Sequence, residues 1–173
     1  MVVLATLGEA QDPALDPALR EAVAAHAASW ARSVAGEGLA LVTDAAPAVL
    51  GDLLAGHDGP VMFVAPDVPR LDAALAQAAL GDIAAGCIVS FAPATDATPF
   101  LLAFADRRPE ALALLAGDRP RNALFADAMA LGDEVGLLRS ERRVVTPADA
   151  RALALDPLVS ADLRALAARA GAS

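Results

Sequence analysis

Short apolar segments that resemble buried strands alternate along the chain with longer segments of helical periodicity. This alternation constrains the fold more than any other feature. The strand-like segments lie at residues 2–7, 39–43, 60–65, 87–91, 100–104 and 135–138. Segments whose apolar residues recur every three or four positions lie between most of them. Such alternation is typical of a mainly parallel sheet covered by helices. We therefore predict an α/β chain, folded as a three-layer α/β/α sandwich.

Helix-start signals support the helical segments. Asp16-Pro17 supplies an N-cap residue followed by a proline at the first helical position, and this helix is expected to end near Gly36. The segment from Thr146 to Asp149 reads as a capping box that opens another helix. The remaining helices are predicted at residues 46–55, 72–80, 109–116, 121–131 and 160–170.

The strand predicted at residues 100–104 departs from the alternation. It follows the strand at residues 87–91 after a loop that is too short to hold a crossover helix. Parallel neighbours need such a crossover, whereas antiparallel neighbours do not. We therefore expect a hairpin-like insertion and a mixed, mainly parallel sheet. Neither a linker nor an internal repeat divides the chain, so residues 1–173 are predicted to form a single domain.

Composition and charge exclude several classes of partner. Hydrophobic residues make up 57% of the chain, which argues against disorder. No apolar run approaches the roughly 18 residues of a membrane helix. The net charge of −9 disfavours binding to nucleic acid or to an anionic membrane surface. The first residues lack the features of a signal peptide, and Cys87 is the single cysteine, so we expect a cytoplasmic protein.

All 13 basic residues are arginine. A mechanism that needs a lysine, as a Schiff base or as a phosphate ligand, is therefore excluded. Arginine side chains suit phosphate and carboxylate groups, although most exposed arginines are only solvated surface. Three small clusters are candidates for phosphate contacts. They are Arg107 with Arg108, Arg119 with Arg121, and Arg139 with Arg142 and Arg143.

Acidic residues follow several of the predicted strands. In open α/β sheets, ligands bind beyond the carboxyl ends of the strands. Gly8 and Glu9 follow the first strand, Asp44 the second, Asp67 the third and Asp96 the fourth. Carboxylates on one rim suit a hard cation such as Mg²⁺, with a phosphate-bearing substrate completing its shell. The alternative is that aspartate is simply common in turns and at helix starts.

Three segments together resemble nucleotide-diphospho-sugar transferases with the GT-A type fold. APDVPRL, residues 65–71, resembles the "SDxPxL" strand end of that superfamily. APATDATPFLLAF, residues 92–104, resembles the "GPAxDGGYYLIGL" segment of an uncharacterised bacterial glycosyltransferase-like branch, and the matching loop of 2-phospho-L-lactate guanylyltransferases. RVVTPADARAL, residues 143–153, resembles the "DVDTPEDLxxL" segment of both groups. The resemblance covers residues 39–153.

The resemblance implies a nucleotide or nucleotide-sugar donor, a small-molecule acceptor and a divalent cation, Mg²⁺ or Mn²⁺. By position, Asp67 matches the family's metal or substrate aspartate, and Asp96 matches the aspartate of the acceptor loop. If the chain is an active transferase, the resemblance implies that Asp67 holds the metal and that Asp96 orients or deprotonates the acceptor. These two are the predicted catalytic residues. The predicted substrate-binding residues are Gly8, Asp44, Thr95, Thr98 and Arg143.

The chain also departs from the pattern that it resembles. The first loop is acidic at Glu9, where the family carries arginine and lysine. Ala97 and Thr98 replace two glycines, and Val145 replaces the second aspartate of "DVDTP". Three hypotheses therefore stay open. The chain is an active glycosyl- or nucleotidyltransferase, or a degenerate, non-catalytic homologue that serves binding or assembly. The third alternative is a different α/β enzyme that only looks similar. Its alanine-rich helix faces are compatible with a homodimer.

Overall fold

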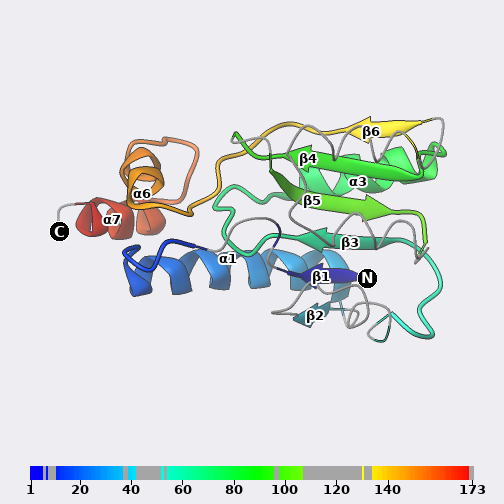
Figure 1. Ribbon diagram of the computed structural model, residues 1–173, viewed down its shortest axis with the longest axis horizontal. Helices are drawn as coiled ribbons and strands as arrows, with labels where there is room; N and C mark the ends of the chain where they lie inside the picture. The colour runs from blue at the N-terminus through cyan, green and yellow to red at the C-terminus, as the bar shows by residue number, and fades with distance from the viewer. Residues whose placement is uncertain are drawn as a thin grey trace.

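The computed structural model describes residues 1–5, 7, 11–36, 39–41, 52, 54–95, 98–106, 130 and 134–171 (Figure 1). Within these residues, six strands form one sheet in the order β2-β1-β3-β5-β4-β6. The strands are β1 (Val2–Leu4), β2 (Leu39–Leu41), β3 (Val61–Val64), β4 (Val89–Pro93), β5 (Pro99–Phe104) and β6 (Val135–Leu137).

The sheet is mixed and mainly parallel, as predicted. β1 pairs in parallel with β2 and β3, and β4 pairs in parallel with β6. β5 runs antiparallel to both of its neighbours, β3 and β4. The expected hairpin-like insertion is thereby confirmed. The carboxyl ends of the parallel strands lie on one edge of the sheet, on the left in Figure 1. We call it the carboxyl edge.

Among the residues that the structure describes, two helices pack against the sheet. α1 (Pro17–Ala35) contacts β1 and β2, and α3 (Ala73–Ala84) contacts β4, β5 and β6. The Trp30 indole N–H in α1 donates a 2.8 Å hydrogen bond to the carbonyl of Asp72, which caps α3. In Figure 1 both helices lie behind the strands. None of the helices that the structure describes is long and apolar enough to cross a membrane.

Apart from a few positions, the helices predicted at residues 46–55, 109–116 and 121–131 fall outside the described residues. Of the helices predicted to cover the sheet, the structure therefore describes one layer, formed by α1 and α3.

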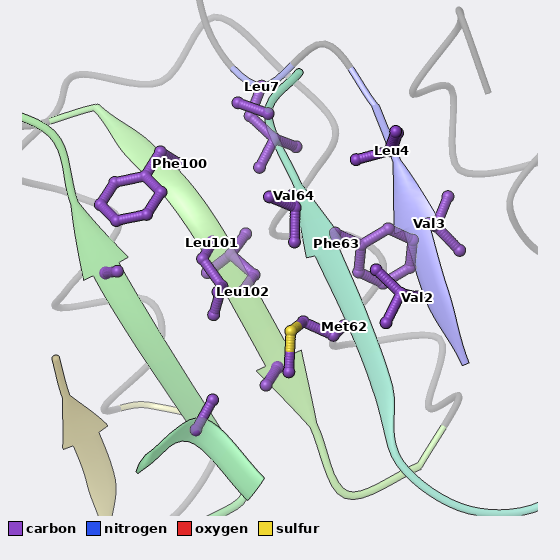
Figure 2. Close-up of a cluster of buried hydrophobic side chains, with 14 of the residues drawn as sticks. Val2, Val3, Leu4, Leu7, Met62, Phe63, Val64, Phe100, Leu101 and Leu102 are labelled. Atoms are coloured by element: carbon purple, nitrogen blue, oxygen red, sulfur yellow. The ribbon is translucent and has the colours of Figure 1, made fainter. Parts of the chain in front are cut away.

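The main core lies within the sheet and beneath α1 and α3 (Figure 2). All four side chains of β3, a central strand between β1 and β5, are buried, so both of its faces are covered. A strand covered on both faces needs apolar side chains throughout, which explains the unbroken run Val61–Val64. The rings of Phe63 and Phe104 meet edge to face at 6.0 Å between centroids. This packing holds the central strands rigidly together.

A second core lies beyond the carboxyl edge. It joins the first half of α1 to α6 (Pro147–Ala154) and α7 (Ala161–Ala170), which lie on the left in Figure 1. Its buried residues are Leu15, Leu19, Val23, Val144, Ala150, Leu153, Val159, Leu163 and Ala167. Because α6 lies beyond the strand ends, the chain leaving β6 must cross the carboxyl edge to reach it.

The capping box predicted at the start of α6 is present. Thr146 accepts a hydrogen bond from the Asp149 amide, and the Asp149 carboxylate accepts one of 2.9 Å from the Thr146 amide. We expect Thr146→Ala to lower the free energy of unfolding by about 1 kcal/mol, because the first turn of α6 loses its side-chain acceptor. Urea denaturation measures this difference. Thr146→Ser is the matched control and should stay close to the wild type; equal losses in both variants would contradict a capping role.

Candidate functional site

The chain between β6 and α6 runs along the carboxyl edge, and we call residues 139–146 the crossing segment. It is tied to the ends of two strands through the backbone. Thr95, just after β4, donates its amide to the carbonyl of Glu141 at 3.0 Å. The Val144 amide donates to the carbonyl of Asp67, just after β3, at 2.8 Å. The crossing segment therefore lies along the edge at which open α/β sheets bind their ligands.

The residues that follow β1 hold the far end of the crossing segment. The Asp12 amide donates to the Val145 carbonyl at 2.8 Å. The Gln11 side-chain amide donates to the Val144 carbonyl at 2.9 Å. Together with the bonds at β3 and β4, these contacts span most of the edge, so the crossing segment is an integral part of the sheet's rim.

Asp67 and Arg143 form a buried ion pair at the centre of this edge. Asp67 is 4% exposed and Arg143 is 3% exposed. Arg143 Nε donates to Asp67 Oδ1 at 2.8 Å, and Nη2 donates to Oδ2 at 2.7 Å. This two-point arrangement is the strongest geometry available to a guanidinium and a carboxylate. Arg143 Nη1 also donates to the Thr98 hydroxyl at 3.3 Å. The structure thus brings together three of the predicted site residues.

The other predicted site residues are placed differently. Thr95 is exposed, and its amide is engaged by Glu141. Gly8, Asp44 and Asp96 lie outside the described residues, so their catalytic and substrate-binding roles stay predictions. The same holds for the arginine clusters at residues 107–108 and 119–121.

A divalent ion does not fit at Asp67 as the described residues are arranged. Each oxygen of its carboxylate accepts a short hydrogen bond from Arg143, whose positive charge already compensates it. Over the part of the chain that the structure describes, no three histidine, cysteine, aspartate or glutamate residues gather as metal ligands would. Mg²⁺ prefers several oxygen ligands at short distance. The expected Mg²⁺ or Mn²⁺ therefore stays a prediction that depends on residues outside the described ones.

A second ion-pair network, which was not predicted from the sequence, lies beside the first. Glu141 is 2% exposed and accepts from Arg139 Nε at 2.7 Å through Oε1. Its Oε2 lies 3.1 Å from Arg70 Nη1. Arg139 Nη2 donates to Asp72 Oδ2 at 2.8 Å. Arg139 and Glu141 are two residues apart, a spacing that places two side chains on the same face of an extended chain. This spacing could have indicated the ion pair between them. No local pattern indicated that Arg70 and Asp72 belong to this network, because they precede Arg139 by about seventy residues in the sequence.

This network keeps its outer members charged. Burial on its own would raise the pKa of Asp72, but the hydrogen bonds from Arg139 and from the Leu75 amide outweigh it and lower that pKa. Burial would likewise lower the pKa of Arg139, but its bonds to Asp72 and Glu141 raise it. A carboxyl group whose pKa is depressed in the folded state contributes its full stabilisation above the unfolded-state pKa, and it loses this contribution as the pH falls through the depressed pKa.

Cys87 is half-buried and lies just before β4, although the predicted strand began at this residue. Burial raises the pKa of its thiol, and the negative charges of Asp82 and Glu134 raise it further. A nucleophilic or metal-binding cysteine needs the opposite environment, one that stabilises the thiolate. Cys87 is therefore poorly suited to either task.

No protein-family model and no curated protein matches the chain. Among solved structures, it is similar to a "putative nucleotide-diphospho-sugar transferase" from Desulfovibrio desulfuricans G20. The TM-score is 0.64, the sequence identity is 14%, and the match covers 99% of this chain and 95% of that chain. At this identity the likeness shows the fold. The predicted α/β fold of the nucleotide-diphospho-sugar transferase type is thereby confirmed.

Proposed function

We propose that this chain binds a nucleotide or nucleotide-sugar without a divalent ion at Asp67. In this proposal it is a non-catalytic homologue of nucleotide-diphospho-sugar transferases that serves binding or assembly. One observation carries the proposal. The carboxylate at the position matched to the metal ligand is held at both oxygens by Arg143, and both side chains are buried.

Transfer from a nucleotide donor depends on neutralising the charge of the departing phosphate groups. In the segment "DVDTP" that the chain resembles, two aspartates are present, and this chain carries Arg143 and Val145 at those positions. The first replacement turns a carboxylate into the cation that pairs with Asp67. The second leaves no carboxylate at the other aspartate position. Both changes favour a metal-independent role.

Two features support binding of a nucleotide. The carboxyl edge of an open α/β sheet is the usual place for such ligands. The crossing segment also brings the exposed Arg139 to that edge, in a chain whose net charge is −9. Local positive charge in an acidic protein favours an anionic ligand over a neutral one.

The second candidate is an active glycosyl- or nucleotidyltransferase that depends on Mg²⁺ or Mn²⁺. The specific observation in its favour is the fold match, which spans nearly the whole of both chains. In this candidate, Asp96 orients or deprotonates the hydroxyl of a small-molecule acceptor. The fold alone does not distinguish the two candidates, because one fold hosts many activities.

Titration of the purified protein with nucleoside triphosphates and nucleotide-sugars tests both candidate functions. We expect the Kd in EDTA to lie within about twofold of the Kd in Mg²⁺ or Mn²⁺, with no transfer or hydrolysis. Binding or turnover that appears only with metal would support the transferase instead. Absence of nucleotide binding at millimolar concentration would overturn both candidates.

The double variant Asp67→Asn with Arg143→Gln tests whether Asp67 is structural or binds a metal. It removes both charges of the pair and keeps polar groups of similar shape. Its folding is verified first by thermal denaturation. If Asp67 is structural, the folded variant should bind nucleotides as the wild type does. Loss of a metal-dependent component would instead assign Asp67 to a metal.

A further inference from the structure

Arg70 and Arg139 reach the same buried carboxylate from different parts of the chain. Arg70 follows β3, and Arg139 follows β6. Glu141 forms an ion pair with each of them: Oε1 lies 2.7 Å from Arg139 Nε, and Oε2 lies 3.1 Å from Arg70 Nη1. The Glu141 side chain is 2% exposed, whereas those of Arg70 and Arg139 are 32% and 38% exposed. A buried anion thus holds two arginines whose outer sides face solvent.

Each guanidinium retains N–H groups for a further ligand. A guanidinium carries five donors in a planar fork. Arg70 uses Nη1 toward Glu141, and Arg139 uses Nε and Nη2 toward Glu141 and Asp72. Within the described part of the chain, Arg70 Nε and Nη2 and Arg139 Nη1 have no hydrogen-bond partner. Because Glu141 already orders both side chains, an incoming anion would lose less binding energy to their immobilisation.

The start of α3 lies beside the two arginines. Asp72 caps this 12-residue helix by accepting from the Leu75 amide, and its second carboxylate oxygen accepts from Arg139. The two carboxylates, Glu141 and Asp72, offset the two guanidinium charges. The partial positive charge at the N-terminus of the helix also attracts an anion.

We infer that Arg70 and Arg139 form a two-armed site for the diphosphate group of a phosphorylated ligand. Two planar forks present enough donors for the oxygens of two linked phosphate groups, whereas a single carboxylate would engage only one fork. The site itself rests on the contacts around Glu141. Naming a nucleotide as its natural ligand rests on the proposed function.

The test is calorimetric titration of the wild type with inorganic pyrophosphate at low ionic strength in EDTA, followed by the same titration of Arg70→Gln and Arg139→Gln. Each substitution leaves the other arginine on Glu141, so the carboxylate keeps a partner. We expect each to weaken pyrophosphate binding by about tenfold or more, since a charge-assisted contact is lost. Arg142→Gln is the matched control, because Arg142 is exposed, lies on the crossing segment and pairs with Asp149 instead. Its pyrophosphate affinity should stay near that of the wild type.

The outcomes separate this inference from the proposed function. Pyrophosphate affinity that is unchanged in both variants, or equally reduced in Arg142→Gln, overturns the inference. Nucleotide binding that persists unchanged in both variants overturns the inference and leaves the proposed function standing. Arginine-dependent pyrophosphate binding without any nucleotide binding supports the site and overturns the proposed function.

Discussion

Replacing Arg143 by alanine is expected to lower the free energy of unfolding by about 3–5 kcal/mol. The substitution leaves the Asp67 carboxylate in a site where it is 4% exposed, without the two hydrogen bonds of 2.7 and 2.8 Å that compensate its charge. It also removes the side-chain link between the end of β3 and the crossing segment, leaving only the backbone hydrogen bond from Val144 to Asp67. The loss should therefore spread to α6 and α7, which the crossing segment connects to the sheet.

Urea denaturation followed by circular dichroism measures this loss. Arg142→Ala is the matched control, because that side chain is exposed and its pair with Asp149 at 3.3 Å is a surface contact. We expect it to cost at most about 1 kcal/mol. The double variant Asp67→Ala with Arg143→Ala should be less destabilised than the sum of the two single variants, since no charge is left buried alone. A value for Arg143→Ala equal to that of Arg142→Ala would show that the pair contributes nothing.

The second large effect is expected at Gly136 in β6. A Cβ added there would lie 2.8 Å from Asp82 Cβ, and closer still to the carboxylate of that residue. Asp82 has little freedom to withdraw, because its Oδ2 accepts a 2.6 Å hydrogen bond from the buried Ser90 hydroxyl. We expect Gly136→Ala to lower the free energy of unfolding by about 1–3 kcal/mol, as overpacking does.

Two further variants identify the cause. Gly136→Ala should be much less harmful in an Asp82→Ala background, because the clashing side chain is then absent. Gly81→Ala, on the exposed side of α3 with no atom near the added Cβ, should instead be stabilising by up to about 1 kcal/mol. Thermal or urea denaturation compares all four proteins. Equal destabilisation by Gly136→Ala in both backgrounds would rule out the contact with Asp82.

Much of the fold could be predicted from local patterns. Asp16 and Thr146 accept the capping hydrogen bonds expected of them, and α1 and α6 begin where these residues indicated. The short connection before β5 correctly predicted a reversed strand. Strand limits were less accurate. The first strand was expected at residues 2–7 and ends at Leu4, because a strand extends only as far as its neighbours β2 and β3 pair with it. An apolar run does not encode that limit.

The candidate site divides in the same way. The position of Asp67 after a buried strand followed from the sequence, and so did the absence of lysine and of a second aspartate at Val145. Only the tertiary structure decided that Arg143, 76 positions later, would lie against Asp67. The burial of Glu141 was likewise evident only from the tertiary structure, because a glutamate among arginines is expected to be exposed to solvent. The physical reason is that helix caps, turns and apolar periodicity depend on neighbours within a few residues. The partner of a buried charge depends on how distant segments cross at the carboxyl edge.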